Sequence, residues 1–139
     1  MKIINKKLTY DTKASGDLIN ITNDLTKALK DTDFQIGNMT VFVSGSTAGI
    51  TTFEYEPGLI RDVGEFYEKL VPSGQHYHHD DAWGDANGFS HIRATFTGQS
   101  LTIPFEDEKL LLGIWQQIVL AEFDNRPRKR EITVQIIGE

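Results

Sequence analysis

The chain has 139 residues, of which 39% are apolar and 10% aromatic, so it can bury a hydrophobic core and is not expected to be disordered. Its net charge of −6 argues against nucleic acid or an anionic membrane as a partner, and the absence of cysteine excludes disulfides and thiolate sites. No segment reaches the ~20 apolar residues of a membrane span, and MKIINKKLTY lacks the apolar run of a signal peptide. We therefore expect one cytoplasmic domain over residues 1–139.

The first half of the sequence predicts strands alternating with two helices. Strands are predicted at residues 7–12, 40–44 and 50–56. The segment 16–32 contains a helix that we expect Thr22 to cap, with Leu25 and Leu29 on its apolar side. A second helix is predicted over residues 58–72, just after Pro57, because apolar residues recur there at helical spacing.

From residue 90 onward the pattern favours β-structure. Ile92, Ala94 and Phe96 alternate with polar residues, which predicts a strand over residues 90–98. Further strands are predicted at residues 100–107, 109–124 and 130–138, and the strand 109–124 is expected to be long, bent and buried on both faces. Residues 123–131 then form the turn between the last two strands. The expected fold class is α+β, a mostly antiparallel β-sandwich with two helices.

All four histidines lie in the unperiodic stretch HYHHDDAWGDANGFSH, from His76 to His91. Long loops without regular structure are often functional in compact domains. His79 and His91, with Asp81 or Asp85, could hold a divalent metal, and the alternative is a hydrogen-bonded structural pair of histidines. His76 and His78 are expected in solvent, and Trp83 is expected to anchor the loop on the core.

Two charged features remain open on the residues alone. The cluster Arg126, Arg128, Lys129 and Arg130 is interpreted mainly as a solvated hairpin, with a phosphate-binding patch as the alternative. Glu122 lies in the apolar run IVLAEFD, where an unpaired carboxylate would be costly to bury. It is therefore expected either to pair with an arginine such as Arg93 or Arg128, or to serve as a pocket carboxylate beside the histidines.

Several short motifs resemble the YjbQ-like family, also called the secondary thiamine-phosphate synthase family. The most specific are Tyr77-x-His79, Asn87-Gly88-x-Ser90-His91, Gly113-x-Trp115-Gln116, Glu122-Phe123-Asp124 and the terminal Gly138-Glu139. The resemblance covers nearly the whole chain. It implies an α+β fold built on a β-sandwich, a homotrimer, and a polar, histidine-bearing pocket near the subunit interface that carries a metal in several members. It also implies at least a weak activity that joins a pyrimidine diphosphate to a thiazole phosphate.

The chain departs from the family pattern at two histidine positions. The family loop usually has N-G-H-S-H, where this chain has Phe89 in place of the first histidine. A second motif, often H-T-T-A, is Gly45-Ser46-Thr47-Ala48 here. In the predicted strand Phe89 and His91 would share a face, so Phe89 is interpreted as a lost ligand. We therefore expect weak metal affinity and restoration of tighter binding by Phe89→His.

Two classes of function remain. The first is a transferase of the thiamine-phosphate synthase type, which needs a site for pyrophosphate and a dry pocket for the pyrimidine. Its candidate catalytic residues are His79, His91, Glu122 and Asp85; its substrate- and cofactor-binding candidates are Arg93, Arg128, Ser46, Thr47 and Asn87; and its metal ligands for Mg²⁺ or Zn²⁺ are His79, His91 and Asp81. The second is a non-catalytic trimeric protein that binds a small anionic ligand and has lost part of the histidine site.

Overall fold

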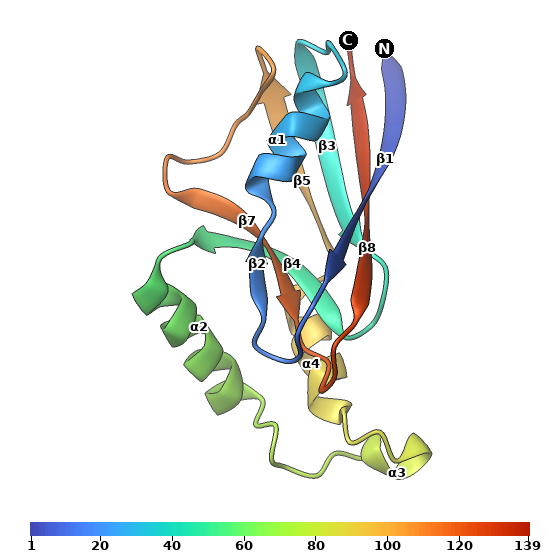
Figure 1. Cartoon of the computed structure of the whole chain (residues 1–139), viewed down its shortest axis with the longest axis vertical. Helices are drawn as coiled ribbons and strands as arrows, with labels where there is room; N and C mark the ends of the chain where they lie inside the picture. The colour runs from blue at the N-terminus through green and yellow to red at the C-terminus, as the bar shows by residue number, and fades with distance from the viewer.

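Two antiparallel sheets form the body of the protein, and the helices of residues 57–70 and 88–97 pack on the smaller sheet (Figure 1). The structure is a computed structural model that describes residues 1–139. Its elements are β1 (Lys2–Asp11), β2 (Leu18–Asn20), α1 (Thr22–Lys30), β3 (Ile36–Val43), β4 (Ala48–Glu54), α2 (Pro57–Leu70), α3 (Asp80–Trp83), α4 (Gly88–Thr97), β5 (Ser100–Glu106), β6 (Lys109–Leu110), β7 (Gln116–Glu122) and β8 (Lys129–Gly138). The expected α+β class is confirmed, although four helices replace the two predicted.

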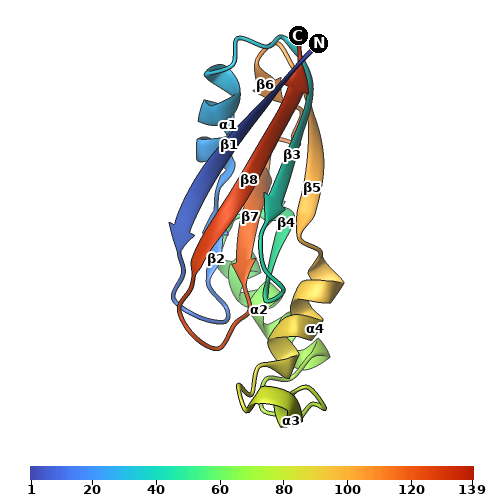
Figure 2. The same ribbon diagram turned by 90° about the vertical axis from the view of Figure 1, so that its right-hand side faces the viewer.

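The strand order is β1-β8-β3-β5-β6 in the larger sheet and β2-β7-β4 in the smaller one, and each neighbouring pair is antiparallel. Figure 2 shows β1, β8, β3 and β5 side by side in the larger sheet. Both chain termini lie at the same end of this sheet, and α3 and α4 lie at the other end. The candidate site described below lies near that second end, where the loops leave the strands.

Strand β7 is the central strand of the smaller sheet and is buried on both faces. Ile118 and Leu120 belong to the core between the two sheets, together with α1. Val119 and Ala121 point the other way, into a second cluster that α2 and α4 cover. Alternation between two apolar environments explains why this segment is a continuous apolar run.

Helices α1 and α2 confirm the two helices predicted from the sequence. Pro57 opens α2, and the Glu56 side chain accepts hydrogen bonds of 2.8 Å from the backbone N–H groups of Gly58 and Leu59. Ile21, and not Thr22, is the cap residue of α1. The Thr22 hydroxyl accepts a 2.8 Å bond from the Ile118 backbone, so it joins the helix to β7.

The strand predicted over residues 90–98 is wrong, because this segment is part of helix α4. The apolar residues that alternate in the sequence are not its buried ones: Ile92 is 39% exposed and Phe96 is 73% exposed. After the buried Gly88 at the start of the helix, the buried positions are Phe89, Ser90, Arg93 and Ala94, which follow helical spacing. Because Ser90 and Arg93 are polar, the buried face of the helix cannot be recognised in the sequence as apolar residues at helical spacing.

The single long strand predicted over residues 109–124 is also wrong. Its two ends belong to different sheets, as β6 and β7, and an exposed segment that includes Gly113 separates them. The turn predicted at residues 123–131 is not a hairpin, because β7 and β8 pair in different sheets. This segment instead carries the chain from the smaller sheet to the larger one. No helix in the structure has the length and apolar character needed to cross a membrane, and the cytoplasmic location stays a prediction.

Candidate functional site

A cavity of about 350 Å³ lies where three loop segments meet at one end of the two sheets. It is lined by Gly45, Ser46, Thr47, His79, Trp83, Asp85, Asn87, His91, Arg128 and Arg130. Seven of these were predicted from the sequence: Ser46, Thr47, His79, Asp85, Asn87, His91 and Arg128. The structure therefore brings together residues that are up to 82 positions apart, from Ser46 to Arg128.

His79 and His91 are in contact, as expected from the sequence. Their ring centroids are 4.4 Å apart, at an interplanar angle of 64°. Burial lowers the pKa of His91, and the neighbouring His79 lowers it further, whereas Asp124 and Asp85 act in the opposite direction. The net effect favours a neutral His91 imidazole, which can accept a proton or bind a metal.

The carboxylate of Asp80 holds the histidine loop closed. It accepts 2.9 Å hydrogen bonds from the backbone N–H groups of Tyr77 and Gly88. These two bonds lower the pKa of Asp80 and keep it ionised. Gly88 is required at this junction, because a Cβ atom there would lie 2.6 Å from the Tyr77 Cβ. These two hydrogen bonds, called the Asp80 clamp below, join the segment that carries His79 to the first turn of α4.

The loop between β3 and β4 lines the cavity and carries backbone donors without partners. The N–H groups of Gly45, Ser46 and Thr47 donate no hydrogen bond within the chain. Gly45 has φ of +134°, and a Cβ atom there would lie 2.8 Å from Nη1 of Arg130. Glycine at this position therefore lets a guanidinium group approach the loop closely.

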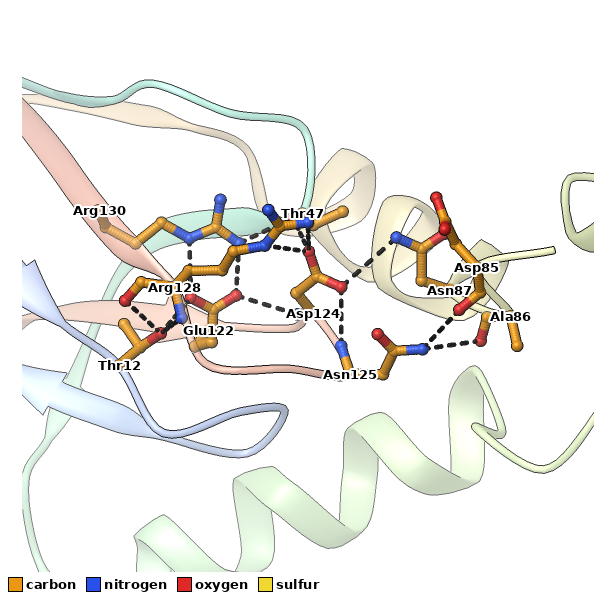
Figure 3. Close-up of polar contacts among 10 residues, drawn as sticks. All are labelled: Thr12, Thr47, Asp85, Ala86, Asn87, Glu122, Asp124, Asn125, Arg128 and Arg130. Carbon is orange, nitrogen blue, oxygen red and sulfur yellow. Dashed lines mark hydrogen bonds and ion pairs between the residues drawn. The ribbon is translucent and has the colours of Figure 1, made fainter. Parts of the chain in front are cut away.

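Two buried carboxylates pair with the two arginines of the cavity wall (Figure 3). Glu122 and Asp124 are both 0% exposed. Glu122 accepts hydrogen bonds from Nε and Nη2 of Arg130, the first of 2.7 Å. Asp124 pairs with Arg128, whose Nε and Nη2 lie 2.7 Å and 2.6 Å from the same carboxylate oxygen. The cavity wall therefore presents guanidinium groups, while the acids are hidden from a ligand.

The pKa of Asp124 reflects these contacts. Desolvation raises it, but hydrogen bonds from Arg128, the Asn125 backbone and Asn87 outweigh that effect and leave the pKa below its ordinary value. Asp124 is thus ionised and forms a stable partner for Arg128. The basic cluster, interpreted mainly as a solvated hairpin, instead contributes Arg128 and Arg130 to the cavity wall.

Three predicted site residues do not join the cavity. Asp81 lies 3.2 Å from His76 and does not accompany the histidine pair. Arg93 is buried and donates to the Val71 carbonyl and to Glu68. Glu122 is also absent from the lining, and its partner is Arg130 rather than the expected Arg93 or Arg128.

Phe89 does not occupy the face of His91, so its interpretation as a lost ligand beside His91 is wrong. In a helix, residues two apart point in directions about 200° apart, not in the same direction as in a strand. Phe89 is buried, and the Arg93 guanidinium lies 4.9 Å from its ring centroid. It therefore contributes to packing on the opposite side of α4.

Two expectations about the loop surface have different outcomes. His76 and His78 are exposed, as predicted. Trp83 was expected to pack on the core, but it is 79% exposed at the rim of the cavity. Its indole is available to a ligand and does not anchor the loop, a role that Asp80 performs.

The donor set does not complete a metal site within the chain. No group of three or more histidine and carboxylate side chains is arranged to bind a metal ion. His79 and His91 supply two imidazoles, whereas zinc sites in proteins use three or four protein ligands. A metal that the family resemblance implies would therefore need further ligands from a substrate or a second chain.

The sequence reasoning missed Arg130, Asp124 and Asp80. A signal for the first two was present: Glu122 and Asp124 are two residues apart, as are Arg128 and Arg130. Residues two apart on a strand share a face, so two acids before a short connection and two arginines after it indicate that each acid forms an ion pair with one arginine. Asp80 gave no such signal, because its role depends on backbone groups.

This fold and cavity define a member of a known class of proteins. A profile of the family described as UPF0047 protein YjbQ-like matches residues 6–139, and the chain belongs to that family. A UPF0047 protein of Archaeoglobus fulgidus is 37% identical over 131 residues, which cover 94% of this chain and 99% of the relative. A UPF0047 protein of Methanocaldococcus jannaschii is 35% identical and covers 100% of this chain and 99% of its own.

Solved structures show the same architecture. The crystal structure of a YbjQ-like protein of unknown function from Sulfolobus solfataricus has a TM-score of 0.91 at 29% identity and covers 99% of both chains. An uncharacterized protein of the yjbq/upf0047 family from Clostridium acetobutylicum has a TM-score of 0.82 at 37% identity, covering 94% of this chain and 99% of the other.

Proposed function

We propose that the chain is a transferase of the thiamine-phosphate synthase type, which binds a pyrimidine diphosphate at the His79–His91 cavity and joins it to a thiazole phosphate. The observation that carries this proposal is the concentration of free donors on one cavity wall. The unpartnered N–H groups of the 45–47 loop lie beside Arg128 and Arg130. Such donors bind phosphate oxygens and stabilise the negative charge that develops on a leaving pyrophosphate.

The reaction makes few demands on acid–base groups. The bond between the pyrimidine methylene carbon and the diphosphate oxygen breaks, and its electron pair leaves with pyrophosphate. The thiazole nitrogen then supplies its lone pair to the carbon. Trp83 at the rim offers an aromatic face to the cationic pyrimidine. The lowered pKa of His91 favours its neutral imidazole, which places no further positive charge near that cation.

Asp85 is the carboxylate of the cavity lining, and it is exposed. Mg²⁺ commonly binds one or two carboxylates together with substrate phosphates, so Asp85 is the residue that would hold it. When bound, the ion would neutralise charge on the diphosphate. Zn²⁺ fits this chain less well, because the histidine pair lacks a third ligand.

We also propose that the protein assembles as a homotrimer of about 47 kDa, three times the 15.7 kDa chain. A groove of about 590 Å³ between α2, β4 and α4 has a mainly apolar lining. Phe66 and Phe96 in this groove are 60% and 73% exposed, and α2 has no buried residue. Exposed apolar area of this kind is typical of protein interfaces.

The alternative function is binding of a small anion without turnover, and it is favoured by the incomplete set of metal ligands. An assay separates the two. Purified protein is incubated with a pyrimidine diphosphate and a thiazole phosphate, with and without Mg²⁺, and thiamine phosphate is measured as fluorescent thiochrome. We expect Arg128→Ala to lower the rate and Arg126→Ala, in the same exposed turn but outside the cavity, to leave it unchanged. Pyrophosphate binding without product would favour the non-catalytic alternative.

A further inference from the structure

The three segments that line the cavity converge on one carboxylate, that of Asp124. Its Oδ1 accepts hydrogen bonds from the Asn125 backbone at 2.8 Å and from the Asn87 side chain at 3.4 Å. Its Oδ2 accepts from Thr47 at 3.1 Å and from Nε of Arg128 at 2.7 Å. Asp124 therefore fixes three segments relative to one another: the 45–47 loop, the start of α4, and the turn before β8 that carries Arg128 (Figure 3).

Glu122 holds the second arginine in the same way. Its Oε2 accepts 2.7 Å bonds from both Thr12 and Nε of Arg130. Its Oε1 accepts from the Asp124 backbone at 3.0 Å and from Nη2 of Arg130. All of these contacts are buried, so Glu122 has no free oxygen to offer a ligand.

The Thr47 hydroxyl connects the two ion pairs. It accepts a 2.7 Å bond from Nη2 of Arg130 and donates to Asp124. Each guanidinium thus uses Nε and Nη2 for its carboxylate and leaves Nη1 without a partner. The Nη1 atom of Arg130 lies against Gly45, in the loop whose N–H groups are also free.

We infer that Asp124 and Glu122 are positioning residues, which hold Arg128 and Arg130 so that their free edges form a prearranged subsite for the diphosphate together with the 45–47 amides. This inference rests on the proposed function. It has an electrostatic consequence: two acids balance two arginines, so the subsite carries little excess positive charge. Affinity for an anion then comes from the orientation of donors, as in an oxyanion hole, and not from net charge.

The Asp124 carboxylate could either position the donors around it or only neutralise Arg128, and these two roles predict opposite effects of the substitution Asp124→Asn on anion binding. In Asp124→Asn the carboxylate charge disappears while the shape is kept. If Asp124 only neutralised Arg128, its removal would make the cavity more positive and tighten anion binding. If Asp124 positions Arg128, Thr47 and Asn87, the released donors lose their arrangement and binding weakens despite the gain in charge.

The test is calorimetric titration of inorganic pyrophosphate into the full-length protein, well below the melting temperature of each variant. We expect Asp124→Asn to weaken binding at least about tenfold, since charge-assisted hydrogen bonds are affected. The matched control is Glu131→Gln, which makes the same charge change at an exposed position of β8 that pairs with Lys7. It should change the dissociation constant by less than about twofold, as surface charges contribute little.

Thr47→Val provides a second test, because it breaks the bridge between the ion pairs without changing charge; it decides the question if Asp124→Asn does not fold. We expect weaker pyrophosphate binding by about fivefold, from the loss of buried hydrogen bonds. Unchanged or tighter binding by the folded variants would overturn the positioning role alone. A wild-type protein that does not bind pyrophosphate would overturn the proposed function and this inference with it.

Discussion

The Asp80 carboxylate and the Gly88 backbone N–H are joined by a 2.9 Å hydrogen bond that closes the loop between the two cavity histidines. A second bond, from the Tyr77 N–H, attaches the same carboxylate to the start of the loop. His79 directly precedes Asp80, and His91 lies in the first turns of α4 after Gly88. The contact between the imidazoles thus depends on a carboxylate that does not line the cavity.

Replacing Asp80 by Asn should loosen this loop and expose the amide protons of Tyr77 and Gly88 to exchange. The pKa of Asp80 is lowered in the folded protein, so the clamp is fully present above the ordinary aspartate pKa of about 3.9 and is lost as the pH falls through the lower folded value. Hydrogen exchange at neutral pH measures the effect. Asp81→Asn is the control, and an equal response in both variants would contradict the clamp.

A Cβ atom at Gly88 should strain the same junction. Gly88→Ala places that atom 2.6 Å from the Tyr77 Cβ, so we expect a loss of stability of about 1–3 kcal/mol in urea unfolding. Gly64→Ala is the matched control, because Gly64 lies inside α2 with no atom near the added methyl group. It should stabilise the protein by about 0.5–1 kcal/mol. Equal effects at both glycines would show that crowding at Tyr77 is unimportant.

Tyr10 should make the protein sensitive to alkaline pH. Burial raises the pKa of its phenol, and the hydrogen bond to Asp24 and the charge of that carboxylate raise it further. Because the folded state holds the proton more tightly than the unfolded chain, this stabilisation is complete below a pH of about 10 and declines as the pH rises. Urea unfolding at pH 8 and pH 10.5 should show a smaller decline in Tyr10→Phe than in the wild type. A parallel decline in both would remove Tyr10 as the cause.

Phe89→His should not create a metal ligand. Phe89 is buried under Arg93, on the side of α4 away from His91, so the new imidazole would meet the core. We expect a loss of stability of about 2 kcal/mol or more. Calorimetric titration with Zn²⁺ should give no gain in affinity over metal-stripped wild type. Tighter binding by the variant would restore the view of position 89 as a lost ligand.

Phe96→Asp should disrupt the proposed trimer without harming the isolated fold. The Phe96 side chain is 73% exposed, so a charge there costs little in a monomer but much within an apolar interface. Light scattering should show about 47 kDa for the wild type and a smaller mass for the variant. Ile3→Asp, at an exposed apolar residue outside the groove, should keep the wild-type mass. A monomeric wild type would refute the assembly.

Two of the elements predicted correctly have a burial pattern that is also an apolar pattern. Helix α1 buries Leu25 and Leu29, and β8 alternates Ile132, Val134 and Ile136 into the core. The histidine contact was also predicted, although from the length and turn residues of the loop and from the family pattern, and not from periodicity. Apolar spacing thus predicts an element well where water is excluded from one face only.

The failures have a different cause. Helix α4 buries Ser90 and Arg93 and exposes Phe96, so its sequence alternates although its burial does not. The spacing of Glu122, Asp124, Arg128 and Arg130 is a sequence signal for the two ion pairs. The hydrogen bonds that Thr47 and Asn87 form with this cluster could not be assigned, because they join segments that only the tertiary fold brings together. Hydrogen bonds of this kind leave no periodic trace in the chain.

Glu122 ends a strand of the smaller sheet, and Arg130 lies in a strand of the larger sheet. Their ion pair therefore forms only when the two sheets are correctly aligned with each other. A shear of one layer by a single residue, about 3.3 Å, would separate the charges and dismantle the cavity wall. We consequently expect that substitutions in the core between the sheets, although far from any ligand, weaken anion binding before they unfold the protein.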